Sequence, residues 1–230
     1  MKKDEYIKRK PHYNFFGDMV DADMQLEYLK DFADSTVNFL RHAARKSKKK
    51  KRELSNALMA IAGEEEYLYS ELYASDVNQA CIIACVIFLE RRIKCFAHDL
   101  NVALQLGLGI RDLSGSLLER FRKYCENVAK LHIDLDELMW RNIKGVVEIR
   151  NCLIHCSGNI DEFKKKSEII EFAKRHETPR IDGSWIRIEE KTVNVVIKTL
   201  REFVESIYKC ALERFPKESD QIPAVDKERN

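Results

Sequence analysis

The chain has 230 residues, and its 40 lysines and arginines nearly balance its 38 aspartates and glutamates, leaving a formal net charge of +2. This balance excludes a general polyanion binder, so any nucleic-acid surface must be local. The length suits one domain of ordinary size with a substantial core. Only 8 Gly and 4 Pro interrupt the sequence, which favours long helices over a turn-rich β architecture.

The sequence predicts a cytoplasmic protein that does not enter a membrane. No run of apolar residues approaches the roughly 20 needed to span a bilayer, and the longest run covers residues 80–89. The N-terminal residues are charged and aromatic and form no apolar signal region. Seven cysteines, an odd number, in a chain large enough to fold without disulfides indicate reduced thiols.

The first third of the chain predicts two helices joined by a basic segment. Residues 1–20 are expected to be a loosely held lead-in. Apolar residues at helical spacing then predict one helix from Ala22 to near Arg45 and another over residues 53–73. Between these helices, residues 45–52 are Lys or Arg at all positions except one serine. Self-repulsion should make this run a solvated link, with an RNA-contacting patch as the alternative.

An apolar segment at residues 81–89 is expected to be the central helix of the core. The serine and aspartate at positions 75–76 are good N-cap residues, and the sequence that follows them is apolar almost all round. Glu90 comes at the inner end of this helix, next to Arg91 and Arg92. These two arginines are the expected RNA contacts.

Capping signals delimit the next two helices. Ser116 and Glu119 form a capping box at the start of one helix. Asp134 with Glu137 is expected to open the following helix, and Gly158 is expected to supply the left-handed residue that ends it.

The end of the chain predicts a small hairpin and a long last helix. The Asp-Gly pair at 182–183 lies between two short apolar segments and indicates a hairpin turn. Residues 193–215 have the most regular helical spacing in the chain. The expected fold class is therefore all-α, a helical bundle with a small β-hairpin insertion and an N-terminal helical extension. The expected parts are an extension packed on the core, a helical domain and a disordered tail: residues 1–74, 75–216 and 217–230.

Arg150 occupies a position where the helical pattern calls for an apolar residue. Rows at spacings of three and four place Arg150 in line with Val147 and Ile154, on the face expected to be buried. Because an unpaired buried guanidinium is costly, a carboxylate, a partner subunit or a phosphate should meet it. Glu90 is the preferred partner, although it could instead be a solvent-facing helix end. The adjoining row carries a carboxyl, an amide and an imidazole: Glu148, Asn151 and His155.

This pattern resembles the HEPN superfamily, all-α domains of which many are metal-independent ribonucleases of toxin, antiphage-defence and RNA-processing systems. The family's hallmark is an Arg followed by a polar residue, with a His four to six positions beyond the Arg. Here these residues are Arg150, Asn151 and His155. Trp140 precedes the motif in the same predicted helix, and the resemblance covers roughly residues 77–215.

The resemblance implies an endoribonuclease that leaves a 2′,3′-cyclic phosphate and a 5′-hydroxyl. Such chemistry needs a base, a cation and an acid. His155 fits the base or the acid, since an imidazole titrates near neutral pH and a helix C-terminus favours its protonated form. Arg150 fits the cation because its planar fork matches phosphate oxygens. Asn151 would orient the imidazole or a phosphate, with Glu90 and Glu148 as supporting residues.

One motif helix does not supply both a base and an acid, so a homodimer that combines two motifs is expected, with RNA as the substrate. An antitoxin or another regulatory protein is a possible partner. Some toxin members are silenced by modification of a tyrosine two positions after the histidine. Ser157 occupies that position here, so this form of control is not expected.

Two other interpretations stay open. Arg150 and His155 could be structural, in a catalytically inactive scaffold that dimerises or binds RNA. Alternatively, zinc could be held by thiols and an imidazole at helical spacing. Buried cysteines need no metal, and no C-x-x-C pair is present. No metal and no cofactor are therefore expected. The residues of the zinc alternative are Cys81, Cys85, Cys152, His155 and Cys156.

Overall fold

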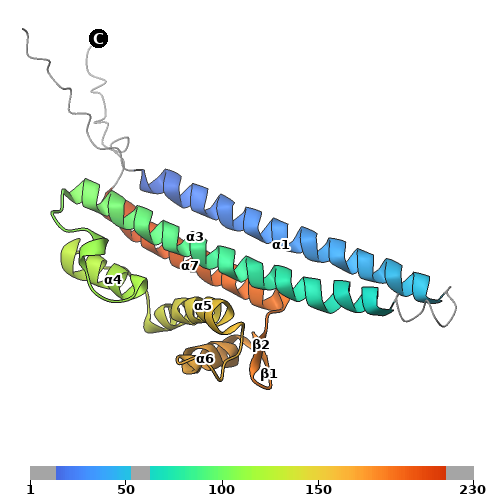
Figure 1. Cartoon of the computed structure of the whole chain (residues 1–230). Coiled ribbons are helices and arrows are strands. Elements are labelled where there is room, and N and C mark those ends of the chain that lie inside the picture. The colour runs from blue at the N-terminus through green and yellow to red at the C-terminus, as the bar shows by residue number, and fades with distance from the viewer. Residues whose placement is uncertain (1–13, 53–62, 216–230) are drawn as a thin grey trace, which may run out of the picture. The chain divides into compact units, whose positions relative to one another are not determined.

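The structure is a computed structural model that describes residues 14–52 and 63–215, and this part of the chain is mainly helical (Figure 1). The predicted all-α character is confirmed at this level, with one small antiparallel sheet. The elements are, in chain order, α1 (Phe15–Arg52), a π-helical segment (Leu68–Leu72), α3 (Tyr73–Leu104), a 3-10 turn (Ile110–Asp112), α4 (Leu117–Lys123), a second π-helical segment (Tyr124–Val128), α5 (Glu137–Cys156), α6 (Lys166–His176), β1 (Arg180–Asp182), β2 (Trp185–Arg187) and α7 (Glu190–Arg214).

The chain forms two compact units, and α1, α3 and α7 each contribute to both. The first unit contains the described residues up to 21, residues 92–134 and the described residues from 204. Its core is aromatic: the ring of Phe96 meets Phe121 at a centroid distance of 5.9 Å and Tyr208 at 5.2 Å, both edge to face. The second unit contains residues 22–91 and 135–203, and therefore α5, α6 and the hairpin.

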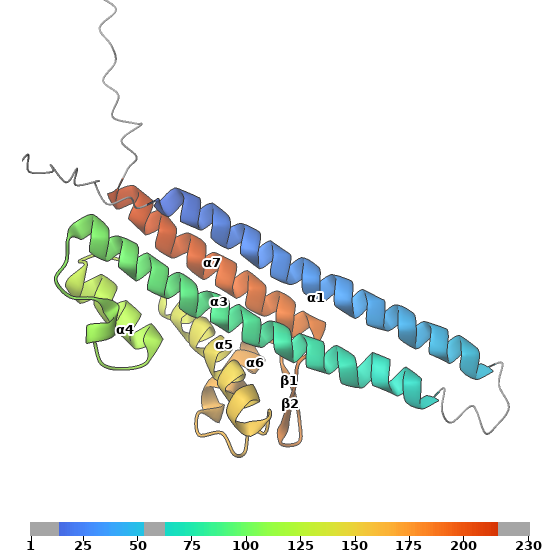
Figure 2. The ribbon, with the colours of Figure 1, turned by 45° about the horizontal axis from the view of Figure 1, so that its top comes forward.

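Within the second unit, the segments of α1, α3 and α7 lie side by side, and α5 lies on the other side of α3 from α1 (Figures 1 and 2). Arg201 of α7 ties α1 to α7 through Asp23 and Glu27, each at 2.7 Å. Asn78 of α3 donates from Nδ2 to the carbonyl of Ile188, just before α7, at 3.2 Å. The strands pair antiparallel with Ile181 opposite Ile186, which confirms the predicted hairpin.

Helix α1 is longer at both ends than the sequence predicts. It begins at Phe15, because the side chain of Asn14 accepts a hydrogen bond from the Gly17 amide at 3.0 Å and Phe15 is buried. The prediction of a loose lead-in is therefore wrong from residue 15 onward, while residues 1–13 lie outside the described part.

The basic run belongs to α1 and is not a link, so that prediction is wrong. Lys and Arg have good intrinsic helix propensity. In addition, acids on the facing helical segment reduce the repulsion within the run. Lys48 Nζ lies 3.6 Å from Glu66, and Ser47 Oγ donates to Glu65 at 3.2 Å.

A continuous helical stretch runs from Gly63 to Leu104, so the predicted helix start at residues 75–76 is wrong. The N-cap residues lie inside this helix, as does the predicted domain boundary after residue 74. The earlier part of the predicted second helix, residues 53–62, lies outside the described part. By length and composition this stretch could cross a membrane. Many of its apolar side chains are nevertheless buried in the core, as in a core helix of a soluble protein: Cys81, Ile82, Cys85, Val86, Phe88 and Leu89.

The predicted capping box is confirmed at α4, where Ser116 and Glu119 exchange side-chain-to-backbone hydrogen bonds. Helix α5 opens two residues later than predicted: Asp136, not Asp134, accepts from the Met139 amide at 2.7 Å. At the other end, Ser157 takes the left-handed position with φ 50°, and Gly158 follows with φ 86°. The predicted last helix is confirmed as α7. The predicted tail, 217–230, lies outside the described part.

Candidate functional site

Arg150 lies at the edge of the buried face of α5 and not at its centre. The centre of this face is formed by Val146, Ile149 and Leu153, all buried. The Arg150 side chain retains 16% of its exposure, and Ile154, in the same row, is 48% exposed. The prediction that the row of Arg150 is the buried row is therefore wrong. The buried row is the adjacent one, which contains Ile149, one position before Arg150.

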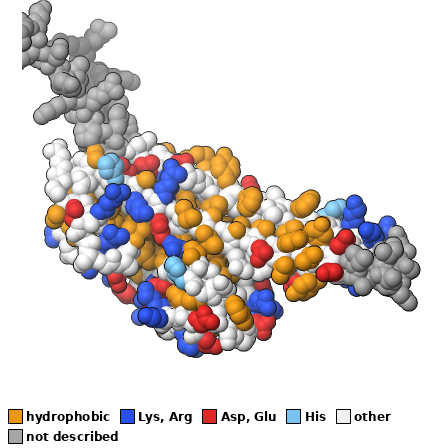
Figure 3. Space-filling view, in the orientation of Figure 1, with side chains coloured by type: hydrophobic (Ala, Val, Ile, Leu, Met, Phe, Trp, Pro, Cys, Tyr) orange, Lys and Arg blue, Asp and Glu red, His pale blue; other side chains and the backbone are white. Residues whose placement is uncertain are grey.

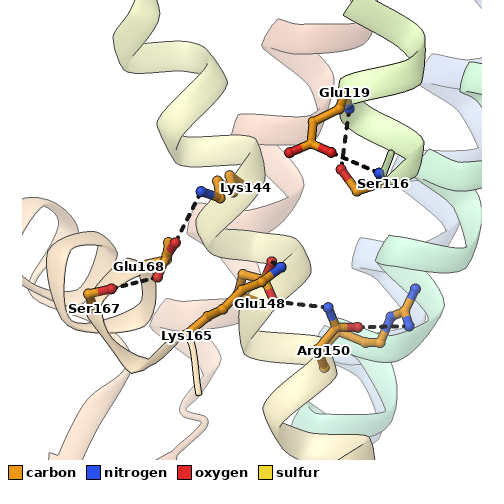
Figure 4. Close-up of polar contacts among 9 residues, drawn as sticks. Ser116, Glu119, Lys144, Glu148, Arg150, Lys165, Ser167 and Glu168 are labelled. Atoms are coloured by element: carbon orange, nitrogen blue, oxygen red, sulfur yellow. Dashed lines mark hydrogen bonds and ion pairs between the residues drawn. The ribbon is translucent and has the colours of Figure 1, made fainter. Parts of the chain in front are cut away.

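Helix α6 covers a second face of α5. Gly145 lies so close to Phe172 that an added Cβ would come within 2.8 Å of the Phe172 Cβ. Lys144 pairs with Glu168 across the same contact at 3.0 Å (Figure 4). This contact explains why Glu148, predicted to lie on a polar row, is buried and only 4% exposed.

A chain of polar contacts links the N-cap residue of α6, helix α5 and helix α3 within the second unit. Figure 4 shows the part of this chain that runs from Lys165 through Glu148 to Arg150. Lys165 donates to Glu148 Oε1 at 2.7 Å, and Asn151 Nδ2 donates to Glu148 Oε2 at 3.0 Å. Arg150 Nη1 in turn donates to Asn151 Oδ1 at 3.0 Å, and Arg150 Nη2 forms an ion pair with Glu90. The expected contact of Arg150 with Glu90 is thus present, and the charges of Arg150 and Glu90 compensate each other.

His155 lies in the last turn of α5 and is exposed. Within residues 14–52 and 63–215 it has no hydrogen-bond or ion-pair partner. The amide of Asn151 is used by Arg150 and Glu148, so Asn151 holds the arginine and does not orient the imidazole.

The two predicted RNA-contacting arginines differ. Arg91 is exposed. Arg92, in the first unit, is only 3% exposed, forms an ion pair with Asp21 and donates to the Asp18 carbonyl at 3.4 Å. Because its guanidinium is enclosed by protein, the prediction that Arg92 contacts RNA is wrong.

Three residues around Arg150 were missed in the sequence. Lys165 was missed because nothing local links it to Glu148, seventeen positions earlier. Ile87 and Ile154 are apolar residues at helical spacing, so the sequence placed them in the core, yet they are 60% and 48% exposed. Ile87 precedes Glu90 by about one helical turn and Ile154 follows Arg150 by about one turn, so an apolar surface flanks the ion pair.

The cysteines show no metal site. All seven are free thiols, and no group of three or more potential ligands that could hold a metal occurs within the described ranges. Burial raises the pKa of Cys85 to about 12 and, in the same direction, the pKa of Cys81 and Cys152. These thiols therefore stay protonated and behave as small core side chains.

A separate cleft of about 870 Å³ lies in the second unit between α1, the helical stretch from Gly63 and the hairpin. Its basic residues are largely matched with acids: Lys48 with Glu66 at 3.6 Å, Arg180 with Glu189 at 3.6 Å, Arg187 with Asp182 at 3.8 Å, and Arg41 with Glu190. No residue of the Arg150 motif lines this cleft.

No protein-family model, curated protein or solved structure matches the chain. Its function is therefore inferred from the residues around Arg150.

Proposed function

We propose that this protein is a metal-independent endoribonuclease of the HEPN type, acting in a toxin or antiphage-defence setting. The observation that carries the proposal is the arrangement on α5 of a half-buried arginine, held by Glu90 and Asn151, and an exposed histidine without a partner in the described residues. RNA is the proposed substrate. An antitoxin or another regulatory protein is the proposed regulator of the nuclease activity.

Arg150 would bind the phosphate on which negative charge grows. A guanidinium has five N–H donors, and Glu90 and Asn151 each accept from one of them. One N–H on Nη1 and one on Nη2 remain to meet phosphate oxygens, whereas Nε is buried. Glu90 is 34% exposed, so a phosphate can share or replace this carboxylate without opening the core.

His155 would take the proton of the ribose 2′-hydroxyl as the 2′-oxygen attacks phosphorus. The bond from phosphorus to the 5′-oxygen then breaks, and that oxygen must receive a proton. A second imidazole, from a second copy of the chain, would donate it. The products are a 2′,3′-cyclic phosphate and a 5′-hydroxyl, and neither step needs a metal or a cofactor.

The exposed Ile87 and Ile154 support this requirement for two copies. Apolar side chains with roughly half of their surface in solvent, next to an ion pair, are typical of an interaction surface. A two-fold contact over these residues would bring two Arg150 and His155 pairs together.

The test is cleavage of labelled RNA by the purified protein in the presence of EDTA. His155→Ala should lower the rate roughly 10²-fold or more, with the helical circular dichroism unchanged because His155 is exposed. His132→Ala, at another exposed histidine, is the matched control and should cleave at the parent rate. Products labelled directly by polynucleotide kinase would identify the 5′-hydroxyl ends.

A catalytically inactive scaffold of the same fold is the second candidate. The observation that favours it is the Glu90–Arg150 ion pair, which compensates the charge of Arg150 without a substrate. If the parent protein binds RNA but does not cut it, or if His155→Ala cuts as fast as the parent, the nuclease proposal is wrong and the scaffold is the better account.

A further inference from the structure

Helix α1 has apolar side chains on two opposite faces. One face is buried in the second unit and includes Leu26, Ala33, Val37 and Leu40. The opposite face presents large apolar side chains to solvent: Met24 is 47% exposed, Tyr28 68%, Phe32 59% and Phe39 68%. At about 100° per residue, these four lie within roughly a quarter-turn of one another around the helix.

The exposed apolar face of α1 is defined by Met24, Tyr28, Phe32 and Phe39. Helix α1 itself lies on the other side of α3 from α5 and its motif (Figures 1 and 2). Hydrophobic side chains are visible in Figure 3 along the part of the surface that carries α1. Four such residues on one helix exceed the scattered apolar residues of an ordinary surface. A contiguous apolar face of this kind marks an interaction surface.

The charges of α1 are segregated along its length. Residues 22–40 carry the acids Asp23, Glu27, Asp31 and Asp34 with one base, Lys30. Residues 41–52 carry eight Lys and Arg and no acid. A second α1 laid antiparallel would bring its basic end toward the acidic part of the first, whereas a parallel one would place the two basic runs against each other.

We propose that a second copy of this chain covers the exposed face of α1 as an antiparallel, two-fold symmetric helix pair that crosses near Ser35. Ser35 is exposed and lies between Phe32 and Phe39 on this face, so the smallest side chain is at the crossing point. At a rise of about 1.5 Å per residue, Phe32 lies about 4.5 Å before Ser35 and Phe39 about 6 Å after it.

The two-fold axis therefore brings each Phe32 opposite Phe39 of the partner subunit, on the same side of the helix pair. The same register places Glu27 near Arg45 of the partner subunit. The apolar and the charged residues are thus complementary in one register about one axis. This self-complementarity is what an isologous contact requires, and it favours a second copy over an unrelated protein.

Sedimentation of the full chain at micromolar concentration is the first test. Phe32→Asp and Phe39→Asp should each halve the sedimenting mass with helical circular dichroism intact, because both side chains are exposed. Leu108→Asp is the matched control, since Leu108 is 52% exposed and lies elsewhere. A parent mass that neither α1 variant changes, or a parent that is already a monomer, would overturn the proposal.

Cysteine cross-linking tests the direction of the pair. In a Cys95→Ser background, which removes the exposed native thiol, Ser35→Cys should form a disulfide-linked dimer on mild oxidation and Met24→Cys should not. A parallel pair would form the disulfide at both positions. If α1 made no contact with a second α1, neither variant would form it. Either outcome refutes the antiparallel register.

This interface is independent of the proposed nuclease. Ile154→Asp would break a dimer over the motif helix and should leave the Ser35→Cys cross-link in place. An inactive protein that still cross-links at Ser35 would refute the nuclease alone.

Discussion

Replacing Gly145 by alanine should loosen the contact between α5 and α6. Gly145 is buried in the middle of α5, where glycine is otherwise a poor helix residue. The Cβ of an alanine there would lie 2.8 Å from both Cβ and Cδ2 of Phe172 and 3.0 Å from its Cγ. Glycine is therefore required by the close approach of α6.

Two opposing terms set the size of the effect. Alanine in a helix interior is favoured over glycine by about 1 kcal/mol. Forcing a methyl group into a packed contact costs about 1–3 kcal/mol. The Phe172 Cβ is bonded to the α6 backbone, so ring rotation cannot move it away and α6 itself must shift. The steric cost should therefore exceed the gain, with a net loss of about 1–2 kcal/mol in the free energy of unfolding.

Urea denaturation of the full chain measures this loss. Arg141→Ala, at an exposed position of the same helix, is the control and should change stability by less than about 0.5 kcal/mol. In a Phe172→Ala background the clash is gone, so Gly145→Ala should be neutral or stabilising there. The explanation fails if Gly145→Ala alone is as stable as the parent. Because α6 follows Lys165, the single variant should also weaken the contact of Lys165 with Glu148 and slow any RNA cleavage.

Three further predictions concern buried polar groups and thiols. Burial, with the nearby Asp18, raises the pKa of Asp99 to about 6 from its usual 3.8. The folded state then binds more protons than the unfolded state, so the free energy of unfolding should fall as pH rises from about 4 to about 6. Asp99→Asn should abolish this fall in urea titrations across that pH range. Arg92→Met should remove the ion pair with the half-exposed Asp21 and the hydrogen bond to the Asp18 carbonyl, and lower the free energy of unfolding by about 1–2 kcal/mol without changing RNA affinity in filter binding; an affinity loss in the folded variant would restore Arg92 as an RNA contact. Iodoacetamide should modify the exposed Cys95 before the buried Cys125, whose thiol pKa is raised by burial; peptide mass spectrometry showing the reverse order would refute this.

The sequence alone predicted the features that depend on neighbouring residues. The capping box of α4, the hairpin turn at 182–183 and the last helix follow from hydrogen bonds and apolar spacing within a few positions. The motif on α5 belongs to the same group, since Arg150, Asn151 and His155 are on one helix in both the prediction and the structure.

Only the tertiary structure decided which side of each helix is covered and where a helix continues. Glu148 is buried because α6 lies over it, and Arg92 is enclosed because Asp21 is beside it. The basic run is helical where acids of another segment face it. In each case the deciding partner is distant in sequence, and the spacing of apolar residues along one helix does not identify which neighbour covers which face.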